Sequence, residues 1–178
     1  KDRATSVTRA YVLDLDTNGP PLLSTFGGKF TTYRKLAEDV LDELSPALGW
    51  PQKHWTALAP LPGGDMPGAD FEAFQAGLGA THAWLPAPLL RRYARAYGTR
   101  AKRMLGDAKS VQELGEQVLP GLHAREIDYL RREEWAVTAE DILYRRSKLA
   151  LHLPASSEAR LDAWLSSHPP AESATAVM

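Results

Sequence analysis

The chain has 178 residues, 44% of them hydrophobic, and a formal net charge of -1 at pH 7. This length can bury one core, or one core plus a small annex. The near-neutral charge gives no electrostatic case for nucleic-acid binding, and the absence of cysteine excludes disulfides, thiol chemistry and Cys-ligated metals. No apolar run approaches the ~18 residues that a membrane-spanning helix needs.

The first predicted element is a β-hairpin over residues 8–28. Residues alternate in character from Tyr11 to Asp16, which is the period of a half-buried strand. A turn signal from Asp16 to Gly19 precedes a return strand from Pro21 to Phe26. Because a lone hairpin is marginal and has two open edges, we expect it to belong to a larger sheet whose other strands lie outside this sequence. The start at Lys1, without an initiator Met, also suggests a fragment.

A glycine pair, Gly27 and Gly28, joins the hairpin to a helix predicted from Thr31 to about Leu44. A strand that turns through two glycines into a helix start presents free backbone N–H groups and the positive end of a helix dipole. Such a place can bind an anion or an electron-rich ring edge, and Lys29 adds a positive charge. The turn is therefore a candidate ligand site, although a glycine pair in this position is often only a turn.

Residues 49–68 are rich in Pro, Gly and Trp and predict a linker, because helices do not persist through such a stretch. Residues 69–168 predict a helical domain, and 169–178 a disordered tail. The expected helices span residues 71–77, 89–97, 99–105, 111–116, 124–135, 142–152 and 158–167. Thr138 to Asp141 resembles a capping box with Asp in place of Glu. The predicted fold class is mainly α, a small helical-bundle C-terminal domain preceded by a β-hairpin and helix in residues 1–48.

Ordered motifs carry a family resemblance. The run from Phe26 to Glu38 (FGGKFTTYRKLAE) resembles a segment near the C-terminal side of FAD-dependent glycerol-3-phosphate dehydrogenase. Further motifs fit the same family in the same order: Thr8–Tyr11, Pro21–Ser24, Trp55–Thr56, Leu61–Gly64, Tyr93–Gly98, Glu134–Ala136 and Thr138–Leu149. The resemblance covers nearly the whole chain.

The resemblance implies a flavoenzyme that oxidises sn-glycerol 3-phosphate to dihydroxyacetone phosphate and passes electrons through FAD to a quinone. It implies a location in the cytoplasm, peripherally associated with the inner face of the membrane, and a homodimer as one state. The chain contains no Gly-x-Gly-x-x-Gly fingerprint. Residues 1–48 would therefore be a remnant of the FAD and substrate domain, whose N-terminal part is the chain's partner. The fragment alone is expected to bind no FAD and to be inactive.

The resemblance also implies a set of site residues. Arg9 and Lys29 are the expected ligands of the substrate phosphate or another substrate oxygen, since a dianion needs convergent cations. The hairpin would bring Arg9 close to Lys29. No catalytic residue and no metal ligand is expected within the chain. The expected flavin-facing segment consists of Gly27, Gly28, Lys29, Phe30, Thr31 and Thr32.

Two alternatives stay open at this point. The longer enzyme could be an oxidase that passes electrons to oxygen. The helical domain could instead be a packing or interaction module without a catalytic role.

Other charged residues have mainly structural interpretations. The basic run from Arg91 to Arg95, continued by Arg100, Lys102 and Arg103, predicts a solvated face, with contact to acidic lipid as the alternative. We expect Arg34 to be structural, and Arg145, Arg146 and Lys148 to form internal ion pairs. The five histidines show no partner at metal or triad spacing and are also expected to be structural: His54, His82, His123, His152 and His168.

Overall fold

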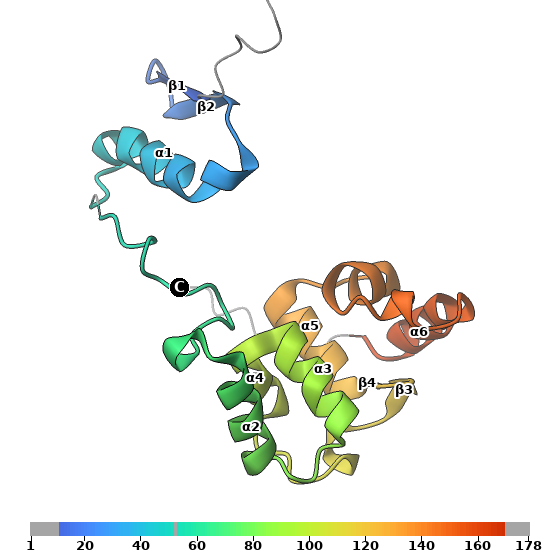
Figure 1. Ribbon diagram of the computed structural model, residues 1–178. Coiled ribbons are helices and arrows are strands. Elements are labelled where there is room, and N and C mark those ends of the chain that lie inside the picture. The colour runs from blue at the N-terminus through green and yellow to red at the C-terminus, as the bar shows by residue number, and fades with distance from the viewer. Residues whose placement is uncertain (1–10, 52, 170–178) are drawn as a thin grey trace, which may run out of the picture. The chain divides into compact units, whose positions relative to one another are not determined.

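The structure is a computed structural model that describes residues 11–51 and 53–169 (Figure 1). The chain divides between Pro60 and Leu61 into two compact units. Helices dominate, and the described strands form two antiparallel pairs. The predicted fold class, mainly α with a leading hairpin, is confirmed.

The first unit is the predicted hairpin followed by a helix. Strand β1 (Tyr11–Asp16) pairs antiparallel with β2 (Leu22–Gly27), and Tyr11 lies opposite Gly27. A 3-10 turn, η2 (Phe30–Thr32), leads into α1 (Tyr33–Leu48). The helix thus begins later than predicted and continues past Leu44, with Pro46 accommodated in its last turns. It ends at Gly49, which is in the left-handed conformation and donates its N–H to the Ser45 carbonyl.

The outer face of the hairpin is exposed and carries three apolar side chains among Asp14, Asp16 and Ser24. Val12 lies directly opposite Phe26, and the alternation of the strands puts Leu22 on the same face. These three side chains are 61%, 59% and 63% exposed, respectively. Within the described residues of the first unit, the only buried side chains are the polar Glu38 and Ser45. The unit therefore has no buried apolar core of its own, which supports the expectation that the hairpin packs against further structure.

The second unit contains the other helices and a short strand pair (Figure 1). Its elements are η3 (Pro67–Ala69), α2 (Phe71–Thr81), α3 (Ala87–Tyr97), η4 (Gly98–Arg100), α4 (Ala101–Leu105), η5 (Gln112–Leu114), β3 (Gln117–Leu119), β4 (Leu122–His123), α5 (Ala124–Glu134), the π-helical turn η6 (Asp141–Arg146), η7 (Leu149–Leu151) and α6 (Ser156–Ser167).

Several helix ends are fixed by local capping residues. Asp70 caps α2 by accepting a hydrogen bond from the Ala73 N–H at 2.9 Å, and α3 ends at Gly98. The capping box is confirmed, because Asp141 accepts from the Thr138 N–H at 3.0 Å while Thr138 Oγ1 accepts from the Asp141 N–H at 3.1 Å. Backbone donors from Thr138 and Val137, together with Arg145, hold the pKa of Asp141 below its ordinary value.

Two predicted helices are wrong. The helix expected over 142–152 stops at Arg146, because Ser147 donates its N–H to the Ile142 carbonyl and Lys148 is left-handed with φ +58°. The helix expected over 111–116 is only the turn η5. The chain then forms the β3–β4 hairpin, which turns at Pro120 and Gly121.

The core of the second unit is formed by side chains from most of its helices. The largest fully buried members are Leu78, Tyr93, Leu105, Leu114, Leu119, Leu122, Ile127, Tyr129, Leu130, Ile142, Leu143 and Leu161.

None of the helices in residues 11–51 and 53–169 combines the length and the apolar run that crossing a membrane requires.

A close backbone crossing attaches residues 61–64 to this unit. The Gly63 carbonyl accepts a hydrogen bond from the Thr99 N–H at 3.0 Å. A Cβ on Gly98 would lie 2.0 Å from the Gly63 oxygen, and a Cβ on Gly63 would lie 2.5 Å from the Tyr97 oxygen. Both positions therefore require glycine. This crossing gives a physical reason for the Leu61–Gly64 motif within the stretch predicted as a linker.

Candidate functional site

The predicted ligand turn is a continuous, exposed segment at the end of β2. Gly27 and Gly28 have φ values of +82° and +104°, a conformation that side chains rarely adopt. Phe30 is 92% exposed. The Lys29 carbonyl accepts hydrogen bonds from both the N–H and the hydroxyl of Thr32, each at 3.0 Å, which closes the turn. Thr32 occupies the N-cap of α1, but its side chain donates to the Lys29 carbonyl instead of accepting from the helix N–H groups.

The electrostatics of this turn favour an anion. Neither η2 nor α1 has an acidic residue in its first turn, so no local carboxylate offsets the positive end of the helix dipole. Among the residues that the structure describes, Lys29 has no carboxylate within ion-pair distance. The turn therefore offers a cation and exposed backbone to a group that arrives from outside the unit.

The two predicted phosphate ligands differ in what the structure describes. Lys29 is exposed beside the glycine turn. Arg9 lies outside the described residues. The strand register places Tyr11 opposite Gly27, so the chain enters β1 at the same end of the hairpin where the glycine turn leaves β2. The proximity of Arg9 and Lys29 stays a prediction.

Arg34 holds a buried carboxylate behind the turn. Its guanidinium pairs with Glu38 at 3.1 Å and donates to the Thr56 hydroxyl at 3.1 Å. Thr56 in turn donates to Glu38 at 2.5 Å. The hydrogen bond from Thr56 and the charge of Arg34 hold the pKa of Glu38 below its ordinary value. The structural role expected for Arg34 is confirmed.

A parallel set of bonds connects the hairpin to α1. The Tyr11 hydroxyl donates to Asp39, which also accepts from Lys35 at 2.5 Å. These two donors, Lys35 first, lower the pKa of Asp39. The sheet and the helix that begins at the glycine turn are thereby fixed to each other.

His54 pairs with a carboxylate that the sequence did not indicate, which agrees with the structural role expected for it. Its Nε2 lies 2.9 Å and 2.8 Å from the two carboxylate oxygens of Asp42. Together with the bonds of Thr56, this contact folds the start of the predicted linker back onto α1. The residues are twelve apart in sequence, and no local pattern indicates the pairing.

In the second unit, Arg92 is not part of a solvated face. It forms a bidentate pair with the fully buried Glu126, with N–O distances of 2.6 Å and 2.5 Å, and also donates to the Gly121 carbonyl at 2.5 Å. The Tyr97 hydroxyl donates to Glu126 as well, and burial raises the pKa of Tyr97 well above its ordinary value. The solvated-face prediction is therefore wrong for Arg92. One hint in the sequence that Glu126 is buried is its position four residues before the buried Leu130 on α5.

The other basic residues behave more nearly as expected. Arg145 pairs with Glu140 and Asp141, both at 2.6 Å, as predicted. Arg146 and Lys148 instead donate to the backbone carbonyls of Glu134 and Tyr144. The ion-pair prediction is therefore confirmed for Arg145 and wrong for the other two.

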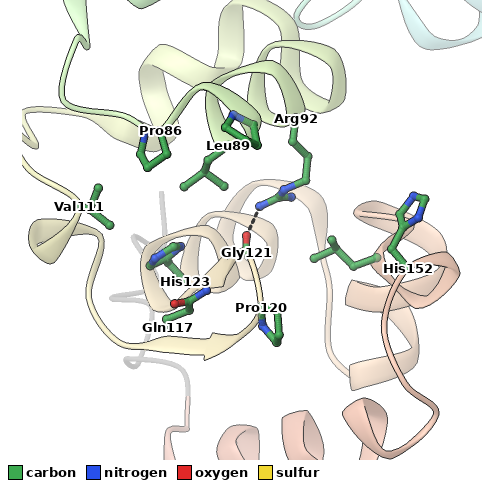
Figure 2. Close-up of a pocket in the computed structure, with 11 residues that line it drawn as sticks. Pro86, Leu89, Arg92, Val111, Gln117, Pro120, Gly121, His123 and His152 are labelled. Carbon is green, nitrogen blue, oxygen red and sulfur yellow. Dashed lines mark hydrogen bonds between the residues drawn. The ribbon is translucent and has the colours of Figure 1, made fainter.

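A pocket of about 440 Å³ lies beside the Arg92–Glu126 pair (Figure 2). Its walls come from α3, η5, the β3–β4 hairpin and η7. Arg92 reaches across to the Gly121 carbonyl, and His123 and His152 are both lining residues (Figure 2). Sequence reasoning missed this pocket, because its walls are brought together only by the tertiary fold. Within the described ranges, no group of three or more acidic or histidine side chains is placed to hold a metal ion.

Comparisons with known proteins identify the family. The family described as the C-terminal domain of alpha-glycerophosphate oxidase matches residues 54–165. A glycerol-3-phosphate dehydrogenase of Pseudomonas aeruginosa is 50% identical over 95% of the chain and 33% of its own length. A D-erythritol 1-phosphate dehydrogenase of Brucella abortus is 44% identical, and an aerobic glycerol-3-phosphate dehydrogenase of Escherichia coli is 42% identical, each over 92% of the chain and 33% of its own length.

The chain thus spans about a third of the length of these relatives. The residues outside the family match include the hairpin, the glycine turn and α1, and these are covered by the longer alignment with the Pseudomonas aeruginosa enzyme. The chain belongs to the family of C-terminal domains of alpha-glycerophosphate oxidase and the related glycerol-3-phosphate dehydrogenases.

Proposed function

We propose that this chain is the C-terminal part of an enzyme that oxidises sn-glycerol 3-phosphate to dihydroxyacetone phosphate, using FAD and a quinone. The observation that carries the proposal is the 50% identity to a glycerol-3-phosphate dehydrogenase over 95% of the chain. The exposed glycine turn supports it, with a lysine that forms no ion pair within the described part of the chain, because that turn offers what an anionic substrate and an electron-rich cofactor edge require.

The glycine turn fits the pyrimidine edge of a flavin. Exposed residues from Gly27 to Thr31, a helix start without acidic residues, and the cation of Lys29 all favour electron-rich oxygen and nitrogen atoms. FAD, when bound, supplies the hydride-accepting chemistry. The residues of this chain would stabilise negative charge on that edge and let it approach the backbone closely, since Gly27 and Gly28 carry no side chains.

Lys29 and Arg9 would bind the substrate phosphate. A phosphate dianion is best held by convergent cations, with Lys acting as a point charge and Arg as a planar fork. Together they would orient the substrate carbon toward the cofactor side of the turn. No group in this chain is assigned the role of general base.

The remainder of the enzyme is the expected partner of the first unit. The exposed face formed by Val12, Leu22 and Phe26 is suited to packing against that partner, because this unit buries no apolar side chain among its described residues. The chain alone is therefore expected to bind no FAD and to lack turnover. We further propose a peripheral location at the inner face of the membrane, with a homodimer as the assembly.

One observation favours a second substrate. The Brucella abortus relative, named for D-erythritol 1-phosphate, is slightly more similar to the chain than the Escherichia coli relative named for glycerol 3-phosphate. The common chemistry is the oxidation of a phosphorylated polyol, and both substrates present the phosphate that Lys29 would bind. Turnover of each compound by the longer enzyme distinguishes them.

The test of the proposal is Lys29→Gln in the longer enzyme. We expect KM for sn-glycerol 3-phosphate to rise about tenfold or more while FAD content stays unchanged, because a phosphate ligand is lost and the backbone turn is kept. Lys53→Gln, at another exposed lysine of the first unit, is the matched control. An unchanged KM in Lys29→Gln would favour the alternative of a packing module. Oxygen consumption without added quinone would favour an oxidase.

A further inference from the structure

The pocket between α3, the β3–β4 hairpin and η7 has features of a binding site separate from the glycine turn. Its volume of about 440 Å³ lies within the range of small-molecule sites. Its walls include Pro86, Pro88 and Pro120, whose rings are conformationally fixed. A pocket lined in this way is preformed, so binding needs little ordering of the walls.

The lining favours a largely apolar ligand. Besides the prolines, Leu89, Val111 and Leu149 contribute apolar surface. Figure 2 shows Leu89 of α3 and Val111 bordering the same space as His123 of the hairpin. An occupant would therefore bury an apolar body among these side chains, and the hydrophobic effect would provide most of the attraction.

Arg92 and His123 add little net charge to the pocket. The guanidinium of Arg92 is already neutralised by the two short bonds to Glu126. Burial, opposed by the charge of Glu126 and reinforced by that of Arg92, lowers the pKa of His123, which favours the neutral imidazole. A charged ligand would therefore lose hydration without gaining a free counter-charge, and the pocket favours an uncharged one.

Two buried polar atoms in the walls lack a hydrogen-bond partner among the described residues. They are Arg92 Nε and His123 Nδ1. His123 as a whole is only 5% exposed. An arginine Nε can only donate, and a histidine nitrogen that carries the proton does the same. A ligand acceptor would therefore satisfy Arg92 Nε, and it would satisfy His123 Nδ1 in the tautomer that carries the proton on that nitrogen.

We propose that this pocket is a second ligand site, which binds an uncharged, mostly apolar ring compound through a carbonyl oxygen that accepts hydrogen bonds from His123 and Arg92. The carbonyl is the acceptor that the unpaired donors require, and the ring is the body that the proline and leucine walls accommodate. The site uses none of the residues assigned to the glycine turn, so it does not depend on the function proposed above.

The experiment uses the intact chain and four probes that share one ring and differ in their head group. These are N,N-dimethylbenzamide with a carbonyl acceptor, toluene with none, benzoate with a negative charge, and benzylamine with a positive charge. Binding is measured by titration followed by NMR, with the ring nitrogens of His123 as the reporter. We expect N,N-dimethylbenzamide to bind saturably and to shift the His123 signals. Each of the other probes should bind about tenfold more weakly or less, the difference that one hydrogen bond makes.

Variants locate the binding. Val111→Trp should fill the half-buried mouth of the pocket and abolish binding of the amide, whereas Val137→Trp, at an exposed valine away from the pocket, should leave it unchanged. His123→Phe keeps a ring in place and should remove the preference for the amide over toluene. Circular dichroism confirms that each variant is folded. The proposal is overturned if the amide shows no saturable binding, if benzoate binds more tightly than the amide, or if Val111→Trp binds as the unaltered chain does.

Discussion

Replacing Glu126 by Gln should strongly destabilise the second unit. Glu126 is fully buried, and three donors converge on it: Arg92 Nη1, Arg92 Nη2 and the Tyr97 hydroxyl. Glutamine offers one acceptor oxygen and puts an NH2 group against a donor. It also leaves Arg92, whose side chain is 21% exposed, without its counter-charge. Breaking a buried pair on one side costs about 3–5 kcal/mol, and the partial exposure of Arg92 puts the expected loss near the lower end, about 3 kcal/mol.

The assay is thermal and urea unfolding followed by circular dichroism at a helical wavelength. A loss of this size should lower Tm by about 10–20 °C in a unit of this length. Glu140→Gln is the control, because Glu140 is 55% exposed and its pair with Arg145 lies at the surface. That control should change Tm by no more than about 2 °C.

A double variant tests the cause of the destabilisation. Arg92→Met combined with Glu126→Gln removes the unpaired buried charge, so the pair should be more stable than Glu126→Gln alone. The reasoning is refuted if Glu126→Gln costs no more than Glu140→Gln, or if the losses of the two single changes simply add.

Three further predictions concern single positions. Gly98→Ala should lower the free energy of unfolding by about 3 kcal/mol, because its Cβ would lie 2.0 Å from the Gly63 oxygen. Its control Gly68→Ala, at φ +63° in open space, should lower it by only about 1 kcal/mol. Equal losses in urea unfolding would contradict this. The pKa of His123 is lowered in the fold, so the unfolded chain takes up the proton first and stability should fall as pH drops below about 6.5. His123→Asn should flatten that part of the stability profile, and an identical profile would argue against the assignment. Trp135→Gly should raise the free energy of unfolding by up to about 1 kcal/mol, because glycine adopts the left-handed backbone at φ +53° without strain and the tryptophan side chain is 83% exposed. A large decrease would show that the ring packs in the fold.

Local patterns predicted the local structure well. The alternation from Tyr11 to Asp16 and the following turn signal identified the hairpin, because register in a hairpin depends on neighbouring residues. The capping box at Thr138 was equally readable, since its two partners are three residues apart. The exposed glycine turn was indicated by its own residues, while its ligands stay a prediction.

The features that sequence reasoning missed depend on distant partners. Arg92 looked like one cation in a basic run until Glu126, thirty-four residues later, was placed against it. The β3–β4 hairpin has strands too short to show a period. The pocket beside it exists only because helix, hairpin and turn converge, and no single segment carries its signature.

The backbone crossing of Gly63 and Gly98 has a consequence for limited proteolysis. Upstream of the crossing, Trp55, Leu58 and Leu61 are 66%, 95% and 69% exposed, and this stretch contains no helix or strand. Chymotrypsin, which cuts after large apolar residues, should therefore cleave here first. A cut after Leu58 would leave the Gly63 carbonyl attached to the Thr99 N–H, whereas a chain shortened to begin at Asp70 would lose that bond. The stable digestion product should thus begin several residues before the first α-helix of the second unit.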